Sequence, residues 1–271
     1  MSRATGTKRT ERNEPAKRAS GAAPRQAPRG AASVSPSVLH PGSLNHILFV
    51  LRELEELYGF GLLPADEFAT GEPLDGLMLT LLSQNTNDRN RDKAYETLRA
   101  GHPAWGEVAA LSSSDITSLI RPAGLGGTKA ARMKDILGRI FSDFGGYSLV
   151  AMLDWAPEDV RSYLSALPGI GPKTVACVMA FDLDMPAFPV DTHVARLSRR
   201  LGWAGEKASP ERIQEFLEAT VPYDLCRGGH LDMIEHGRKI CRARKPECGE
   251  CVISRVCGSF GLPAEKRAAA R

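Results

Sequence analysis

Apolar side chains recur every three or four residues from residue 43 onward, which is the spacing of one face of an α-helix. The first such stretch runs from Ile47 through Leu51 and Leu54 to Tyr58. Glycine and proline residues separate the stretches and indicate turns, and no region is rich in strand patterns. The sequence therefore predicts an all-α protein, with further helices over residues 74–82, 89–98, 115–120, 130–144, 157–164, 173–181, 194–201, 211–219 and 231–241.

Residues 1–42 have a different composition, rich in Ala, Pro, Arg, Ser and Gly, with almost no large apolar side chain before Val34. Such a segment cannot bury enough apolar surface to offset the entropy lost on ordering, so we expect a disordered tail. Residues 1–30 contain eight Lys or Arg and two acidic residues, a charge of +6, whereas the whole chain carries +3. The tail is interpreted as a solvated extension or as a non-specific DNA-binding arm, and a targeting peptide is the third alternative.

The remaining composition is that of a globular protein, with 42% hydrophobic and 25% charged residues in the chain. No apolar run approaches the roughly 20 residues of a membrane-spanning helix, and the N-terminus lacks the apolar segment of a secretory signal. We therefore expect a monomer without membrane association, cytoplasmic and associated with the nucleoid. Organellar or nuclear targeting by the tail stays an alternative.

Four cysteines lie close together near the C-terminus with the spacing C-x6-C-x2-C-x5-C, namely Cys241, Cys248, Cys251 and Cys257. Four thiolates so close together indicate a metal site, and sets of this kind hold iron–sulfur clusters. The long first gap differs from the two tight cysteine pairs of a zinc ribbon. The spacing favours a 4Fe–4S cluster over structural zinc or accidental thiols. Cys177 and Cys226 lie outside the spacing and are expected to be buried thiols.

A second motif joins two predicted helices in the segment 159–182, which reads Leu-Pro-Gly-Ile-Gly at residues 167–171. The glycines permit a tight turn with positive φ and a close approach of the backbone to a ligand. Pro172 suits the first turn of the following helix. Free backbone N–H groups at such a turn bind a phosphate irrespective of base sequence. The string predicts a helix–hairpin–helix that contacts DNA through Gly169 and Gly171.

Lys173 follows this turn, in the first turn of the second helix. The positive end of the helix dipole disfavours a cation there and so favours the neutral amine, which is a nucleophile. Further along, Asp191 precedes another predicted helix and fits its N-cap, where backbone N–H groups keep a carboxylate ionised. A phosphate-contacting lysine and a purely capping aspartate are the alternatives. Beside a phosphate-binding turn, the pair predicts chemistry at C1′ of a nucleotide.

With the hairpin, the Val-Asp-Thr-His segment at 190–193 and the cysteine loop in this order, the chain resembles the endonuclease III family of DNA glycosylases over about residues 43–258. The resemblance implies a six-helix barrel domain over 65–185 and an iron–sulfur cluster domain made of 43–64 and 186–262, followed by a short tail over 263–271. It also implies that Lys173 is the nucleophile, that Asp191 is its acidic partner and that His193 supports this aspartate.

Members of this family flip the damaged nucleotide out of the duplex, and side chains fill the gap that it leaves. The family glutamine lies in a segment like L-L-S-x-Q-x-x-D, whereas this chain has Leu-Leu-Ser-Gln-Asn-Thr-Asn-Asp at 81–88. A gapless alignment places Asn85 at that position and Gln84 just before it, so both amides are candidates. The apolar wedge of the family falls within residues 123–129, which makes Leu125 the candidate, with an inward-packed leucine as the alternative.

Five basic residues surround Cys241, namely Arg238, Lys239, Arg242, Arg244 and Lys245. A loop held by a metal cluster could present them to the DNA backbone, and a solvated basic face is the alternative. The cluster itself is expected to be structural, because protein thiolates fill all four ligand positions, and electron transfer is the alternative.

The resemblance implies a bifunctional DNA glycosylase and abasic-site lyase that removes oxidised pyrimidines from double-stranded DNA. The Lys173 amine would attack C1′, and β-elimination through a Schiff base would follow, with Asp191 stabilising the cationic sugar. A monofunctional adenine or mismatch-thymine glycosylase of the same superfamily is an alternative, although these enzymes tend to lack a lysine at this position. A non-enzymatic DNA-binding iron–sulfur protein is the other alternative.

Overall fold

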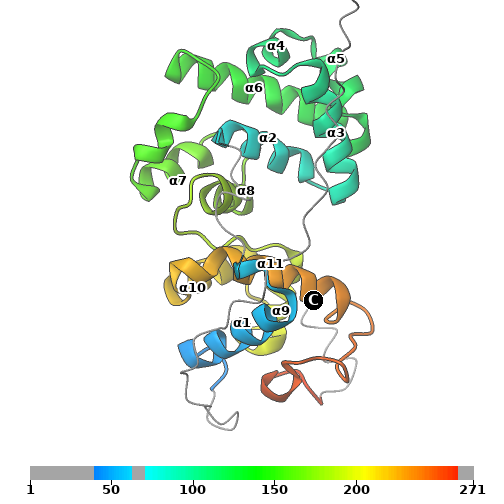
Figure 1. Cartoon of the computed structure of the whole chain (residues 1–271), viewed down its shortest axis with the longest axis vertical. Helices are drawn as coiled ribbons and strands as arrows, with labels where there is room; N and C mark the ends of the chain where they lie inside the picture. Colours follow the sequence, from blue (N-terminus) through cyan, green and yellow to red (C-terminus); the bar gives the residue numbers. More distant parts are fainter. Residues whose placement is uncertain (1–39, 63–70, 262–271) are drawn as a thin grey trace, which may run out of the picture. The chain divides into compact units, whose positions relative to one another are not determined.

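The computed structural model describes residues 40–62 and 71–261, and every regular element in them is helical (Figure 1). The all-α prediction is confirmed for these residues. The longer helices are α1 (Leu44–Tyr58), α2 (Pro73–Ser83), α3 (Asp88–Gly101), α6 (Gly126–Phe144), α7 (Pro157–Ser165), α9 (Thr192–Leu201), α10 (Pro210–Thr220) and α11 (Tyr223–Lys239). The shorter ones are η2 (Phe60–Leu62), α4 (Trp105–Ala110), α5 (Ser113–Leu119), η4 (Arg121–Ala123), η5 (Val150–Asp154), α8 (Pro172–Cys177), η6 (Val178–Asp182) and η7 (Ser254–Val256).

Two predicted segments fall outside the described residues: the N-terminal tail up to residue 39 and the short tail over 263–271. No helix in the described ranges combines the length and the apolar composition needed to cross a membrane.

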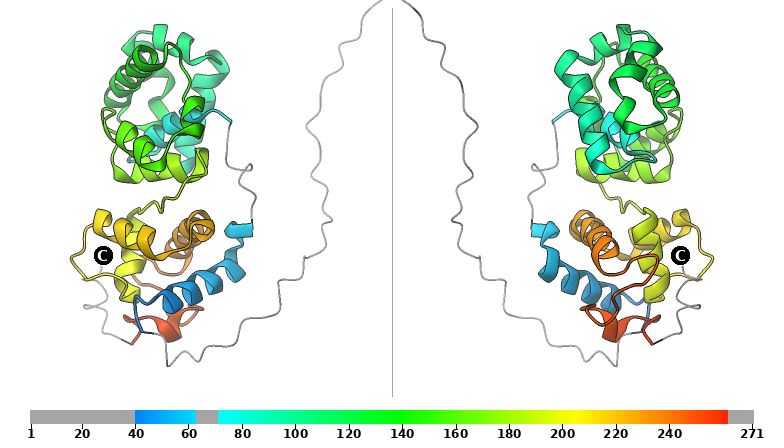
Figure 2. Two further views of the ribbon diagram at one scale, coloured as in Figure 1. Left: turned by 90° about the vertical axis from the view of Figure 1, so that its left-hand side faces the viewer. Right: turned by 90° about the vertical axis from the view of Figure 1, so that its right-hand side faces the viewer.

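Two hydrophobic cores organise the helices. The first lies among the elements from α2 to η6 and includes Leu77 and Leu81, which are fully buried. The second joins α1 to α9, α10 and α11 and includes Ile47 and Val194. Ala187 belongs to the first core and Phe188 to the second. The chain therefore passes from one core to the other in the segment that joins η6 to α9 (Figure 2). The domain boundaries proposed after residues 64 and 185 stay predictions.

In the second core, α1 and η2 pack against α11 (Figure 1), and two glycines of α11 permit these contacts. A Cβ at Gly228 would lie 2.4 Å from the Cα of Gly61, and one at Gly229 would lie 3.0 Å from the side chain of Leu51. The predicted helix start at residue 231 is wrong, because the helix begins at Tyr223. Each glycine inside a helix costs about 1 kcal/mol, and the close packing at Gly228 and Gly229 offsets this cost.

Three further differences between the predicted and the observed helices lie in the first core. α6 begins at Gly126, four residues before its predicted start, with Leu125 as a left-handed N-cap. The predicted helix 173–181 changes at Val178 into the π-helical turn η6, in which the Leu183 N–H donates to the Val178 carbonyl. Such turns are frequent at functional sites. α4 was not predicted, because six residues are too few to show a periodic pattern.

A pair of carboxyl groups joins α1 to α11. Oδ1 of the buried Asp232 accepts from the Phe60 N–H at 3.3 Å, and Oε2 of Glu55 accepts from the Gly61 N–H at 2.7 Å. The remaining oxygens, Oδ2 and Oε1, are also buried. These two oxygens have no hydrogen-bond partner among the described residues, so a proton shared by the two carboxyl groups would satisfy both. Burial, with the neighbouring Glu55, raises the pKa of Asp232 to about 8.

This shared proton predicts that stability falls as the pH rises from about 5 to about 8. In the unfolded chain the carboxyl loses its proton near the ordinary pKa of about 4, so the folded state binds more protons across this range. Asp232→Asn keeps a donor toward Glu55 and should lose this part of the pH dependence of the thermal midpoint. Asp224→Asn, exposed in the first turn of the same helix, should keep the wild-type slope. Equal slopes in wild type and Asp232→Asn would contradict the shared proton.

Candidate active site and metal centre

The predicted helix–hairpin–helix consists of α7, the turn 166–171 and α8. Gly169 has a φ of 73°, which favours glycine, and a Cβ there would displace the Arg132 side chain, whose Nε would lie 2.4 Å away. Gly171 is the N-cap of α8 with a φ of −96°, so of these two glycines only Gly169 has a positive φ. No described atom outside its immediate neighbours lies within 4 Å of its Cβ position. Its backbone is therefore open to a ligand.

Lys173 lies in the first turn of α8 and is half-buried. One turn further along, the thiol of Cys177 is buried, as predicted. Burial raises the pKa of this thiol, whereas the Lys173 charge and a hydrogen bond with the Lys173 side chain lower it. The charges of Asp182 and Asp191 raise it further. The lysine amine and the Asp191 carboxylate therefore both lie within electrostatic reach of one thiol.

Asp191 is the N-cap of α9, as predicted. Its Oδ1 accepts hydrogen bonds from the backbone N–H groups of His193 and Val194, both at 2.8 Å. These two bonds fix the orientation of the carboxylate at the positive end of the helix dipole. Its Oδ2 accepts no hydrogen bond from the residues that the structure describes, so this oxygen can face a ligand.

A further side chain of this group, His230 of α11, was not predicted from the sequence. It is buried, and its Nδ1 lies 2.8 Å from the Pro189 carbonyl, which requires the proton on that nitrogen. Burial lowers the pKa of His230, the Asp191 charge raises it, and the Lys173 charge lowers it. A neutral imidazole thus lies near both candidate catalytic groups. No motif marks this histidine, because its neighbours come from other elements.

Buried arginines of α9 connect the candidate catalytic aspartate with the cysteine loop. Nη2 of Arg196 lies 3.0 Å from Nδ1 of His193 and donates to the Gly237 carbonyl at 2.9 Å. Its Nε donates to the Cys241 carbonyl at 3.0 Å. One turn further, Arg200 Nη1 donates to the Cys241 sulfur at 3.2 Å. His193 is therefore held by Arg196, behind the helix end that Asp191 caps, and its supporting role stays a prediction.

The four cysteines of the predicted metal site line one pocket, together with Arg200 and His236. The pocket has about 460 Å³ of space, including its open mouth. Thiolates around a single zinc ion each lie about 2.3 Å from it. Within the described ranges, no three Cys, His, Asp or Glu side chains converge closely enough to hold one ion. Four cysteine thiols around one pocket are a ligand set of the kind that holds an iron–sulfur cluster.

The chemistry of the thiols also favours a cationic group. Burial raises the pKa of Cys251 to about 12, and the charges of Cys241, Cys257 and Cys248 add to this. Iron binds thiolates and offsets both the burial and the repulsion. The Nη1–H group of Arg200 donates a hydrogen bond of the kind that sulfurs of iron–sulfur clusters accept. The residues therefore fit a 4Fe–4S cluster held by the four cysteines, which joins the C-terminal loop to α9 and α11.

The two candidate amides after α2 take different positions. Nε2 of Gln84 donates to the Gly169 carbonyl at 3.2 Å, and its Oε1 accepts from Nη1 of Arg132 at 3.0 Å. Asn85 is exposed, with a φ of 54° in the left-handed region that asparagine tolerates. Gln84 is thus bound to the hairpin, and Asn85 is the amide available to a ligand.

Leu125 is 58% exposed and has a φ of 49°. The alternative of an inward-packed leucine is therefore wrong. A non-glycine residue in this conformation costs roughly 1–3 kcal/mol, and an exposed leucine forgoes roughly 1.5–3 kcal/mol of burial. Both costs are typical of a residue that is kept for contact with a ligand.

The five basic residues around Cys241 fall into two groups. Three form ion pairs: Arg238 with Asp88 at 2.9 Å, Lys239 with Glu235 at 2.8 Å and Arg242 with Glu247 at 3.0 Å. Arg244 and Lys245 are exposed, and no described carboxylate pairs with them. These two are the stronger candidates for phosphate contacts, and a DNA-binding role of all five stays a prediction.

Two family profiles match the chain. The first describes a HhH-GPD superfamily base excision DNA repair protein and matches residues 78–222, which include the hairpin, Lys173 and Asp191. The second is the iron–sulfur binding domain of endonuclease III and matches residues 241–257, which include the four cysteines.

Individual proteins agree with these profiles. Endonuclease III of Thermotoga maritima is 34% identical, over 69% of this chain and 83% of its own length. An Arabidopsis thaliana protein named as a DNA glycosylase is 38% identical over 62% of this chain, which spans 57% of that protein. A solved structure of a trapped endonuclease III–DNA covalent intermediate has a TM-score of 0.69 at 24% identity, over 83% of this chain and 98% of that one. That structure shares the fold.

We expect the purified protein to be yellow-brown and to contain iron. Cys248→Ala should lose the visible absorbance and the iron, and its thermal midpoint should fall, because the cluster no longer links the loop to α9 and α11. Cys226→Ala removes a buried thiol outside the pocket and should keep both. An active wild-type protein with stoichiometric zinc and no iron would contradict the cluster.

Proposed function

The chain belongs to the HhH-GPD superfamily of base excision DNA repair proteins as an endonuclease III-like DNA glycosylase, and from this premise we propose that it is a bifunctional glycosylase and abasic-site lyase for oxidised pyrimidines. Its substrate would be double-stranded DNA with a damaged base or an abasic site. The observation that carries the proposal is the position of Lys173, directly after the hairpin turn and within reach of the same groups as Asp191.

The hairpin binds first. The backbone at Gly171 faces open space at the start of α8, and a phosphate of the damaged strand contacts its N–H groups. C1′ of the damaged nucleotide is inaccessible in the stacked duplex, so the nucleotide flips out. Asn85 and Leu125, both exposed and on neighbouring loops, fill the gap.

The Lys173 amine then attacks C1′, and the base leaves with the electron pair of the glycosidic bond. The sugar ring opens to a protonated Schiff base on the lysine nitrogen. Loss of a proton from C2′ moves electrons toward the iminium and expels the 3′ phosphate, and water hydrolyses the Schiff base to free the lysine.

Asp191 stabilises the positive charge that develops on the sugar. Its Oδ1 is occupied by two N–H groups, so the orientation of Oδ2 is set before substrate binds. A neutral His230 adds no positive charge beside the iminium. The 4Fe–4S cluster supplies structural support for the loop that Arg196 and Arg200 hold.

Lys173→Gln should lose both base release and strand cleavage on duplex DNA that contains thymine glycol. We expect losses of about 1,000-fold or more, because the nucleophile is removed. Asp191→Asn keeps the capping acceptor but removes the charge, so the rate should fall about 100-fold with little change in DNA affinity. Lys207→Gln, an exposed lysine, serves as the control. Strand cleavage retained by Lys173→Gln would contradict the lyase mechanism, and base release without cleavage by the wild type would indicate a monofunctional glycosylase.

Asn85→Gly should slow base excision and weaken the preference for the opposite base. Glycine keeps the left-handed backbone and removes the amide, so the thermal midpoint should not change. Gln84→Ala should instead lower the thermal midpoint, because the amide links Arg132 to the hairpin and each lost bond contributes about 1 kcal/mol. Excision kinetics and melting curves of both variants check this assignment, and the opposite pattern would assign Gln84 to the gap.

A further inference from the structure

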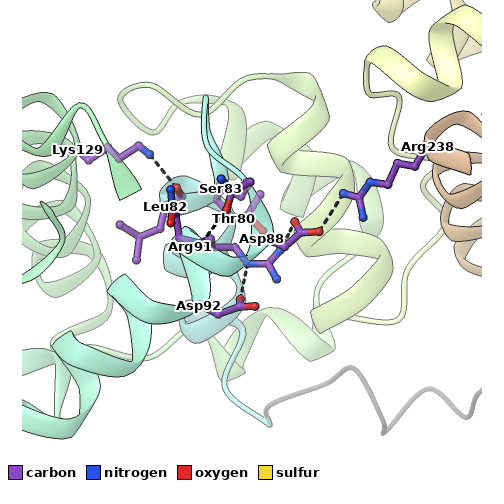
Figure 3. Close-up of polar contacts among 10 residues, drawn as sticks. Thr80, Leu82, Ser83, Asp88, Arg91, Asp92, Lys129 and Arg238 are labelled. Atoms are coloured by element: carbon purple, nitrogen blue, oxygen red, sulfur yellow. Dashed lines mark hydrogen bonds and ion pairs between the residues drawn. The ribbon is translucent and has the colours of Figure 1, made fainter. Parts of the chain in front are cut away.

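Lys129 is a buried cation of α6 that takes no part in the proposed reaction. Its side chain is 1% exposed, and its amine donates to the Leu82 carbonyl at 2.7 Å and to the Ala123 carbonyl at 2.8 Å. Figure 3 shows the first of these bonds. No carboxylate among the described residues pairs with it. Burying a lysine is costly unless its N–H groups are used, so an apolar residue would not serve the same purpose here.

The two carbonyls lie at the ends of the helical elements that precede the two loops proposed to enter the duplex. Leu82 lies in the last turn of α2, three residues before Asn85. Ala123 ends η4, two residues before Leu125. Carbonyls at helix ends lack partners within the helix, and the single amine supplies one to each loop.

Both loops contain a non-glycine residue with a left-handed backbone, Asn85 at 54° and Leu125 at 49°. Such conformations persist only where the surroundings hold them. The loop of Asn85 is also held at its far end, where Asp88 pairs with Arg238 at 2.9 Å (Figure 3). Lys129 differs from this contact because it holds both loops at once.

We propose that Lys129 is a positioning residue for nucleotide flipping, which fixes the loops of Asn85 and Leu125 as one unit so that both side chains enter the gap together. This inference rests on the proposed function. Without the amine, the two carbonyls would be left buried and unpaired, and each loop would have to be ordered separately on the DNA. Lys129 acts through these loops and touches no reacting atom.

The test compares gap filling with chemistry in the cluster-containing full chain. Gap filling is followed by the fluorescence of 2-aminopurine opposite a stable tetrahydrofuran abasic analogue. Chemistry is followed by borohydride trapping on an abasic strand whose partner strand lacks the opposite nucleotide, so that no orphaned base needs support. Lys129→Met should slow the fluorescence change about 100-fold, as small misplacements can, and should trap at close to the wild-type rate on the gapped duplex.

Lys134→Met is the matched control. The Lys134 amine of the same helix also donates to two carbonyls, of Ala109 and Leu111, which belong to neither loop. This variant should behave as wild type in both measurements. If Lys129→Met does not fold, the same two measurements are made on Lys129→Gln, whose amide can still donate a hydrogen bond.

Unchanged gap filling in Lys129→Met, an equal loss in Lys134→Met, or a parallel loss of trapping on the gapped duplex would overturn the inference. If the wild type fills the gap but forms no adduct, the proposed chemistry fails, and the fluorescence result still decides the role of Lys129.

Discussion

The hydrogen bonds at the start of α9 are the constraint on which the candidate active site depends. One oxygen of Asp191 accepts from two backbone N–H groups, so the carboxylate cannot rotate and its second oxygen has a fixed direction. The same helix carries Arg196 and Arg200, which both donate to the Cys241 carbonyl. A displacement of the cysteine loop would therefore displace α9 and, with it, Asp191. A cluster with no part in bond making can support catalysis in this way.

The first core imposes a second constraint through α6. Arg132 fills the space beside Gly169 and holds Gln84, while Lys129 binds the carbonyls that precede the two exposed loops. The hairpin proposed to bind phosphate and the loops proposed to enter the gap are thus in contact with one helix. Binding energy from the phosphate contact can be used for nucleotide flipping only if these parts move together. The buried Lys129 and the half-buried Arg132 of this helix provide that connection through their contacts with the loops and the hairpin.

The sequence predicts those features that depend on residues a few positions apart. The cysteine spacing, the turn from Gly169 to Pro172 and the N-cap at Asp191 are of this kind, because local geometry alone determines them. The start of α11 could not be predicted, since Gly228 packs against Gly61 from a distant part of the chain. A pair of glycines that marks a turn in isolation is here a point of close helix packing.

The same distinction applies to single side chains of the site. Gln84 and Asn85 are equivalent candidates in the sequence, and only the contacts of Gln84 with Arg132 and Gly169, from other elements, separate them. His230 lies in no motif, and its role depends on charges that other helices bring near it. Local chemistry can be predicted from spacing, whereas the choice between neighbouring residues requires the fold.

The proposed mechanism requires that the Lys173 amine form the bond to C1′, and this bond can be located in the protein. The wild-type protein is reacted with an abasic duplex in borohydride, the adduct is digested with a protease, and the modified peptide is identified by mass spectrometry. The predicted result is a single reduced adduct on Lys173. An adduct on another lysine or on the N-terminal amine, in protein that cleaves the strand, would contradict it.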